Sequence, residues 1–360
     1  MLFKFLLTLY LTRSLPASPQ SSLSRSRRSL VRYGNFKPDL YKVLPATVIK
    51  NLLVQIEIDC VFHCIEEESC YSVNTGTVLT AEKIYFCELL ATDKYRATEK
   101  LQANISYHHF SPWSRCESGP CKNNGNCIPD FELNSYRCDC KPGFAGTHCE
   151  RTGKSCSEIK LYSSKAMSAS YRIDPDGEGG NDSFTVECDM IAENGVGLTV
   201  ISHDSEARMQ VNGFEAHGSY SRDIVYFGVG LHSLAQLAGL TAVSAHCEQF
   251  IKYECKNSLL FYPVENLHGW WVSRDSTAMT NWGGATSSDR YKCACGLSNT
   301  CADVNRACNC DKNDEVWRED SGLLTEKTYL PVKQLRFGDT GSSNEEGYHT
   351  LGKLKCYGMV

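Results

Sequence analysis

Twenty cysteines in a chain of 360 residues constrain the fold more than any other feature. They fall into three blocks: four between Cys60 and Cys87, six between Cys116 and Cys149, and ten between Cys156 and Cys356. Because each block holds an even number, each can close its own disulfides, which is typical of small domains in an oxidising compartment. We therefore expect a multidomain, disulfide-rich fold, and a metal-rich intracellular protein is the weaker interpretation.

The first residues are typical of an exported protein. Lys4 precedes a short apolar run from Phe5 to Leu11, and Ala17 offers a small residue for cleavage, so we expect a signal peptide at 1–17. The apolar run is too short to cross a bilayer, which makes a membrane anchor the weaker alternative. The chain is accordingly expected in the extracellular space or matrix.

A basic, serine-rich segment follows at 18–32, and its lack of apolar periodicity predicts disorder. Inside it, Arg25-Ser26-Arg27-Arg28 resembles the site cut by furin-type proprotein convertases, which predicts cleavage after Arg28; a plain basic linker is the alternative. Without residues 1–28 the chain keeps 32 basic and 42 acidic residues, a net charge of −10 instead of −5. That balance argues against nucleic-acid binding, and the lack of a later long apolar run argues against a membrane span.

The first cysteine block has the pattern of a small α+β domain. Apolar residues recur at helical spacing across 48–67, which predicts an amphipathic helix there. Cys60 and Cys64 are four residues apart and would project from one face of that helix. Residues 71–74 and 85–90 are predicted to be strands.

Residues 33–110 carry the cysteine pattern C-x3-C-x5-C-x16-C, which resembles the PAN/apple family. The outer cysteine pair of true apple domains is absent, so the domain would be a reduced version. Members of this family bind proteins or carbohydrates, and His63 has no ligand-spaced partners that would indicate a metal site. The resemblance implies two disulfides, Cys60–Cys87 and Cys64–Cys70.

Residues 112–150 have the spacing C-x4-C-x5-C-x10-C-x-C-x8-C. This resembles an EGF-like domain, a β-hairpin unit too small to be stable without bridges. Residues 110–115 lack the carboxylates of calcium-binding versions, so no calcium is expected. Ser118 lies in a C-x-S-x-P-C signature for O-glucosylation, with an unmodified serine as the alternative. The resemblance implies three disulfides: Cys116–Cys127, Cys121–Cys138 and Cys140–Cys149.

Near its start, the segment 152–360 contains the motif Y-x-I-D-P-D-G, and the motif C-D-M follows it. These motifs resemble the start of fibrinogen-like domains, which are mainly β with some α structure, and the resemblance implies a Cys156–Cys188 disulfide. The stretch from Asp174 to Gly179 imitates the start of an EF-hand, but its twelfth position is Thr185 instead of glutamate. We expect a turn between two strands there.

Further motifs in order, among them G-W-W-V, N-W-G-G, K-C-A-C-G and W-R-E-D, look like the fibrinogen-like module of contactin-associated proteins in the neurexin superfamily. The resemblance covers about 113–358. The resemblance does not extend to the calcium-stabilised pocket in which related lectins bind acetylated sugars. Two C-x-C pairs could hold zinc, but disulfides are favoured. Their pairing stays open among Cys247, Cys255, Cys293, Cys295, Cys301, Cys308, Cys310 and Cys356.

No nucleophile elbow, zinc-protease motif or P-loop is present, so we expect a binding protein without a cofactor and not an enzyme. Sequons at Asn104 and Asn181 predict N-glycosylation of exposed loops. Trp113, Trp270 and Trp271 are candidate contact residues, although the last two are better explained as core residues.

Three functions fit these modules. The first is a secreted adhesion or matrix scaffold protein that binds extracellular glycoproteins or matrix components. The second is a framework component of a mineralised skeleton with weak calcium or mineral contact, because this set of modules looks similar to secreted invertebrate matrix proteins, including those of coral skeleton. The third is a soluble receptor ligand released by cleavage after Arg28.

Overall fold

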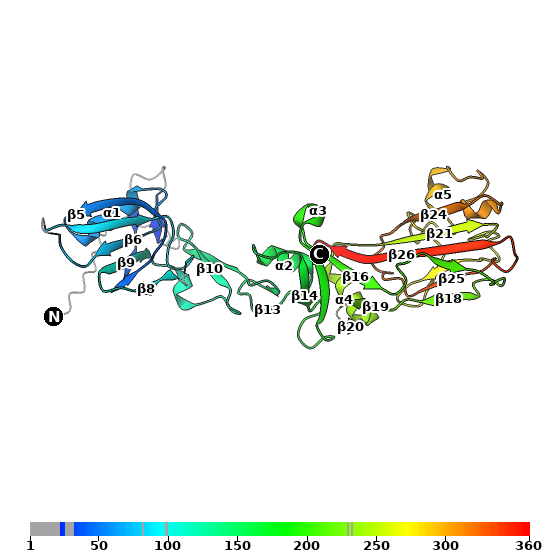
Figure 1. Ribbon diagram of the computed structural model, residues 1–360, viewed down its shortest axis with the longest axis horizontal. Helices are drawn as coiled ribbons and strands as arrows, with labels where there is room; N and C mark the ends of the chain where they lie inside the picture. The colour runs from blue at the N-terminus through cyan, green and yellow to red at the C-terminus, as the bar shows by residue number, and fades with distance from the viewer. Residues whose placement is uncertain (1–21, 26–31, 81–82, 98–99, 229, 232) are drawn as a thin grey trace, which may run out of the picture. The chain divides into compact units, whose positions relative to one another are not determined.

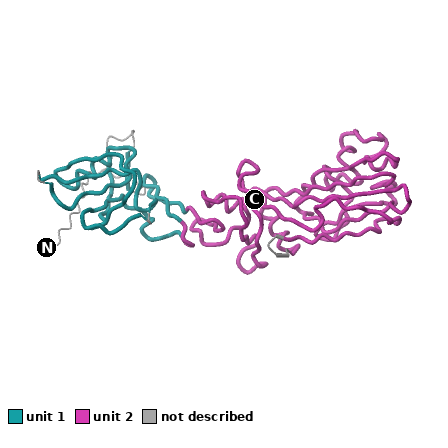
Figure 2. The backbone as a smooth tube through the Cα atoms, in the orientation of Figure 1, with its two compact units in different colours: residues 1–121, 126–138 teal, residues 122–125, 139–360 magenta. Residues whose placement is uncertain are grey.

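The computed structural model describes residues 22–25, 32–80, 83–97, 100–228, 230–231 and 233–360. The expected signal peptide with Ala17 and the cleavage site after Arg28 lie outside these residues. The chain divides into two compact units (Figure 2): unit 1 comprises 1–121 and 126–138, and unit 2 comprises 122–125 and 139–360. The block expected to be EGF-like is therefore divided between them.

Unit 1 is built on an antiparallel sheet with the strand order β3-β9-β6-β7-β5. Helix α1 (Glu57–Glu66) packs against β5, β6 and β7 (Figure 1). Every residue of β6 is buried, so this strand is the centre of the unit. The bounds are β3 (Phe36–Asp39), β5 (Val48–Val54), β6 (Ser72–Gly76), β7 (Tyr85–Leu90) and β9 (Tyr107–Pro112), with β4 (Lys42–Val43) paired to β8 (Gln102–Ala103).

The helix expected over 48–67 is wrong in its first half, because Val48–Val54 is strand β5 and the helix occupies 57–66. A helical spacing of apolar residues cannot be told from a strand over so short a stretch. Pairing with β7 along the whole strand decides in favour of β structure. Glu57 and Asp59 then lie in the first turn of α1, where acidic side chains favour a helix.

Two disulfides hold α1 in place: Cys60–Cys87 joins the helix to β7, and Cys64–Cys70 closes the turn before β6. All four cysteines are fully buried. These are the pairs that the PAN/apple resemblance implied. The strands expected at 71–74 and 85–90 correspond to β6 and β7.

Residues 22–25 depart from the disorder expected for 18–32. Strand β1 (Leu23–Ser24) pairs with β2 (Tyr33–Gly34), and the Leu23 side chain is buried. The expectation rested on the composition of the whole segment. Composition does not take account of a single apolar residue, here Leu23, that is buried against the rest of the unit.

The hairpin of β10 (Asn126–Asp130) and β11 (Ser135–Asp139) follows the single turn η2 (Arg115–Ser118). Further along, β12 (Phe144–Ala145) pairs with β13 (Arg151–Thr152). The disulfides of this region are Cys116–Cys127, Cys121–Cys138 and Cys140–Cys149, as the EGF-like spacing implied.

Unit 2 contains two antiparallel sheets that share one hydrophobic core. The larger has the order β14-β15-β16-β26-β21-β24, with β17 paired to β26 and β19 to β16; the smaller has the order β18-β25-β22-β23. Tyr253 of β21 and Phe337 of β25 stack across the two sheets with ring centroids 4.4 Å apart. In Figure 1 the long strand β26 runs beside β21.

The larger sheet comprises β14 (Ala169–Ile173), β15 (Phe184–Asp189), β16 (Leu198–His203), β17 (Met209–Val211), β19 (Tyr226–Gly228), β20 (Gly230–Leu231), β21 (His246–Lys256), β24 (Arg318–Leu324) and β26 (Glu346–Tyr357). The smaller comprises β18 (Tyr220–Asp223), β22 (Trp270–Val272), β23 (Ala278–Met279) and β25 (Gln334–Phe337). The helical segments are α2 (Cys156–Tyr162), α3 (Ala192–Gly195), α4 (Leu234–Val243), α5 (Ala294–Ser298) and η3 (Cys310–Lys312).

The turn expected at 174–179 connects β14 to β15. The carboxylate of Asp174 accepts a hydrogen bond from the Gly177 amide at 3.1 Å. Gly177 and Gly179 have φ values of 80° and 87°, a region that side chains disfavour. The Asp-Pro-Gly composition of this stretch therefore builds a turn.

All twenty cysteines lie within the described residues, and none is free. Each disulfide stays within its own block. The cysteines of the two C-x-C pairs are oxidised, so they present no thiolates to zinc. The five bridges of the third block are Cys156–Cys188, Cys247–Cys356, Cys255–Cys310, Cys293–Cys308 and Cys295–Cys301.

Candidate functional site

The outer face of strands β21, β24 and β26 in unit 2 carries an exposed aromatic and charged groove. Its volume is about 450 Å³. We call this surface the Trp317 face, and its lining residues are Arg208, Glu254, Trp317, Arg318, Glu319 and Tyr348.

Strand register brings these residues together. Glu254 of β21 lies opposite Tyr348 of β26 on one side and Glu319 of β24 on the other. Side chains alternate between the two faces of a strand. Tyr253, which precedes Glu254, therefore points into the core, and so does His349, which follows Tyr348. Both are fully buried.

Trp317, immediately before β24, is the large aromatic of this face, with 45 % of its surface exposed. Its ring centroid lies 5.7 Å from that of Tyr348, with the planes tilted by 47°. The Arg208 guanidinium also lies over the Tyr348 ring, 3.3 Å from the ring centroid. This distance fits a cation–π contact, so the three side chains form one cluster.

The charges beside the cluster are paired. Arg208 donates to the Glu254 carboxylate at 2.8 Å, and the ammonium group of Lys252 lies 3.3 Å from the same carboxylate oxygen. Burial alone would raise the pKa of Glu254, but the hydrogen bonds from these two cations outweigh it and lower the pKa. Lys252 also lies 3.4 Å from a carboxylate oxygen of Glu319. The carboxylates of this face thus already have cationic partners.

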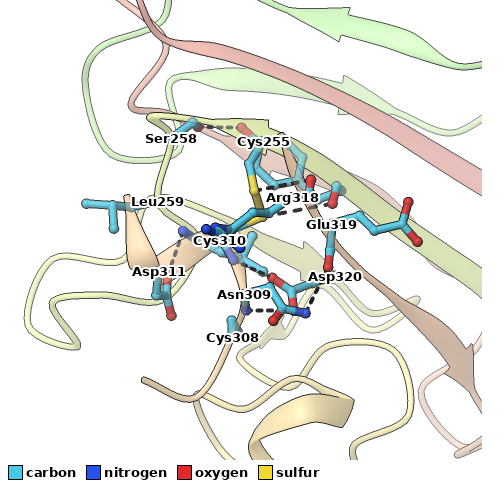
Figure 3. The surroundings of a disulfide bond; sticks show 12 residues. Cys255, Ser258, Leu259, Cys308, Asn309, Cys310, Asp311, Arg318, Glu319 and Asp320 are labelled. Carbon is cyan, nitrogen blue, oxygen red and sulfur yellow. Dashed lines mark hydrogen bonds between the residues drawn. A yellow bond between two sulfur atoms is a disulfide. The ribbon is translucent and has the colours of Figure 1, made fainter. Parts of the chain in front are cut away.

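A disulfide and a buried carboxylate hold the strand ends from which this face projects (Figure 3). Cys255 at the end of β21 is bonded to Cys310 in η3. The Asp320 carboxylate of β24 accepts hydrogen bonds from the amides of Asn309 at 2.9 Å and Cys310 at 2.8 Å. Burial raises the pKa of Asp320 to about 6, the carboxyl of Asp311 adds to the rise, and the amide donors oppose it.

The carboxylate of Asp311 performs a similar task for the loop after β21. Its Oδ1 atom accepts from the amides of Leu260 and Phe261, both at 2.9 Å. Asp320 also lies near Cys293 and Cys308, but these two sulfur atoms are joined in a disulfide. The cluster of Asp320, Cys293 and Cys308 therefore stabilises the loops around it and offers no thiolate to a metal.

The residues predicted from the sequence are spread over the chain. Asn181 and Ser118 are exposed, and Asn104 is partly buried. Trp271 is a core residue whose indole donates to the Asn281 carbonyl at 2.8 Å. Trp270 is partly buried against Gly218. None of these lies in the groove, and the modifications at Asn104, Asn181 and Ser118 stay predictions.

The sequence reasoning missed the Trp317 face. Trp317 belongs to the W-R-E-D motif, but no motif contains Arg208 or Tyr348. Their proximity depends on the pairing of β26 with β17 and β21, which no local pattern displays. The alternation of apolar and polar residues in β26 gave no signal either, because the polar His349 is buried and the aromatic Tyr348 lies on the outer side.

The model of the fibrillar collagen C-terminal domain matches residues 144–353, which is more than half of the chain, and that of the EGF-like domain matches residues 116–148. The chain belongs to the family with the fibrillar collagen C-terminal domain. The PAN/apple resemblance of 33–110 stays a prediction.

Among curated proteins the chain is similar to neurexin-4 of Drosophila melanogaster, with 35 % identity over 254 residues, covering 68 % of this chain and 19 % of the relative. It is also similar to contactin-associated protein 1 of Mus musculus, 35 % identical, and of Homo sapiens, 34 % identical, each over 68 % of this chain and 17 % of the relative. The chain thus spans less than a fifth of the length of these relatives. In the described part of the chain, no helix is long and apolar enough to cross a membrane.

Proposed function

We propose that this chain is an extracellular adhesion protein without catalytic activity, which binds a protein partner through the Trp317 face. The observation that carries the proposal is the exposed cluster of Trp317, Tyr348 and Arg208. Tryptophan, tyrosine and arginine are the residues most enriched at the energetic centres of protein interfaces.

Two further observations support a place outside the cell, and a third supports a protein partner. Every cysteine is in a disulfide, which persists in an oxidising environment. An EGF-like domain adjoins the matched C-terminal region. The relatives include a contactin-associated protein, whose name describes association with another protein. From that name we infer for this chain only that it binds a protein.

The pairing on the Trp317 face favours a protein partner over mineral. Glu254 and Glu319 already contact Arg208 and Lys252, so their carboxylates are not free to bind calcium ions at a mineral surface. The aromatic side chains of Trp317 and Tyr348 instead offer a large contact area at low entropic cost.

The test uses fluorescent beads coated with the full chain and cells of the source organism. We expect Trp317→Ala to reduce cell-bound beads about tenfold, because loss of a central aromatic contact has effects of that order. Val304→Ala is the matched control, since Val304 is an apolar residue of unit 2 with 82 % of its surface exposed. Trypsin treatment of the cells should abolish binding. Equal binding by Trp317→Ala and the unchanged chain would contradict the proposal, and loss after glycosidase but not trypsin would assign a glycan ligand.

A further inference from the structure

The charged side chains that line the Trp317 face are paired with opposite charges. Glu254 and Glu319 both contact the ammonium group of a neighbouring lysine. Arg318 donates to both carboxylate oxygens of Asp314, at 2.9 and 2.6 Å. Since Arg208 is bound to Glu254 as well, every charged residue that lines the groove in the described structure has an oppositely charged partner. The face therefore offers a ligand no unpaired charge, and electrostatic attraction does not select the partner.

Two exposed aromatic rings remain as the contact surface of the groove. The centroids of Trp317 and Tyr348 are 5.7 Å apart and their planes are tilted by 47°, so the two ring faces lie at an angle to each other. The indole N–H of Trp317 is also available, because none of the described residues accepts a hydrogen bond from it. A buried indole N–H usually finds an acceptor. We therefore expect a ligand that covers Trp317 to bring an uncharged acceptor, such as a backbone carbonyl.

The edge of the sheet beside the groove is closed to a further strand. Within the described sheet β24 pairs with β21 alone and is thus the edge strand. The Glu319 carbonyl of β24 accepts a hydrogen bond from the Asn309 side chain at 3.1 Å. The Leu323 carbonyl accepts one from the Gly284 amide at 2.9 Å. Because an extended peptide that adds a strand needs such carbonyls free, a partner segment has to lie across the outer face of the sheet instead.

The composition of the groove also disfavours a helix as the ligand. An amphipathic helix needs apolar contacts at every third or fourth residue, but the lining of this groove consists of two aromatic and four charged residues. A proline-rich segment in the polyproline II conformation fits better. Its rings lose no side-chain entropy on binding, its backbone carbonyls make no internal hydrogen bonds, and such segments dock into aromatic-lined grooves.

We propose that the Trp317 face binds a proline-rich segment of its protein partner in the polyproline II conformation. A proline ring packs against Trp317 and Tyr348, and a backbone carbonyl of the segment accepts from the Trp317 indole. This inference rests on the proposed adhesion function and adds the chemistry of the partner. Because the charges around the groove are paired with one another, binding depends little on salt.

The test titrates the full chain into a fluorescently labelled polyproline peptide of about ten residues and follows fluorescence polarisation. We expect saturable binding whose dissociation constant changes less than about twofold between about 0.05 and about 0.5 M NaCl. Trp317→Ala and Tyr348→Ala should each weaken binding about tenfold. A glycine–serine peptide of the same length should not bind.

The matched control is Tyr262→Ala. Tyr262 is an exposed tyrosine of unit 2, and the guanidinium of Arg306 lies 3.4 Å from its ring centroid, but it does not line the groove. This variant should bind the peptide as the unchanged chain does. An equal loss in Tyr262→Ala and Tyr348→Ala would overturn the proposal, because it would show that the peptide stacks on any exposed tyrosine. A dissociation constant that rises tenfold with salt would overturn it as well.

The same peptide, added unlabelled to cells with bound beads, should displace the beads. Failure to bind or to displace would overturn this inference, and the adhesion proposal would stand if Trp317→Ala still lost cell binding. If the peptide required Trp317 but cell binding did not, the assignment of the groove would stand and the adhesion proposal would fall. Beads that resist the peptide but are released by glycosidase would assign a glycan to the groove instead.

Discussion

The guanidinium group of Arg208 covers the ring of Tyr348 at 3.3 Å from the ring centroid. Because the Arg208 side chain is exposed, its contact with the Tyr348 ring shapes the binding surface more than it stabilises the fold. We expect Arg208→Ala to weaken cell binding of coated beads about tenfold while leaving the thermal unfolding midpoint nearly unchanged. Arg172→Ala, at an exposed arginine of β14, is the control and should bind normally. Normal binding by Arg208→Ala would remove this residue from the interface.

The buried carboxylate of Asp320 is expected to be structural. In Asp320→Ala the buried amide of Cys310 and the partly buried amide of Asn309 lose their acceptor, which costs about 2–5 kcal/mol. Urea unfolding followed by tryptophan fluorescence measures this loss, since Trp271 and Trp282 lie in the same core. Asp182→Ala, at an exposed aspartate, should change little. A loss below about 1 kcal/mol would contradict this role.

His109 makes the stability of unit 1 sensitive to acid. Burial lowers the pKa of His109 to about 4 from its ordinary 6.5, and the charges of Asp39 and Lys94 act in opposite directions. The unfolded chain therefore takes up a proton at higher pH than the folded chain. Stability should fall by about 3 kcal/mol in total as the pH drops from about 6.5 to about 4.

Replacement by a group that does not titrate checks this dependence. His109→Gln should flatten the pH profile of the unfolding free energy in that interval, although it also perturbs the contacts with Asn74 and Ser111 at 2.9 and 2.8 Å. The slope, and not the absolute stability, is the readout. An unchanged slope in His109→Gln would assign the pH dependence to other groups.

Disulfides of unit 2 should differ in their effect on stability according to the loops they close. Cys247–Cys356 spans 109 residues, whereas Cys295–Cys301 spans 6. Loop-closure entropy then predicts losses of about 5 and about 2 kcal/mol when each pair is replaced by alanines. Denaturant unfolding of the two double variants measures the difference, and the reverse order would show that native contacts, not chain entropy, dominate.

The cysteine framework could be predicted from the sequence because spacing within a small module is local. The pairs implied for the first two blocks, together with Cys156–Cys188, all occur in the structure. The remaining four bridges were left open, since eight cysteines allow many pairings and their partners lie between 6 and 109 residues apart. Cys247 and Cys356, for example, meet because β21 and β26 are neighbours.

Errors of prediction arose where a tertiary contact overrides a local pattern. Val48–Val54 has an apolar spacing compatible with a helix, yet it pairs with β7. Residues 22–25 have the composition of a disordered segment, yet Leu23 finds a buried position. The Trp317 face was missed for the same reason, because cross-strand register places Glu254 beside Tyr348.

The central position of β26 has a consequence for synthesis. Strands β16 and β21 both hydrogen-bond to β26, which is translated long after them. Cys247 must wait for 109 further residues before Cys356 emerges, about 5–20 s at ordinary translation rates. During that interval the edges of both strands are unpaired and prone to associate with other chains. Completion of unit 2 therefore has to follow the synthesis of β26.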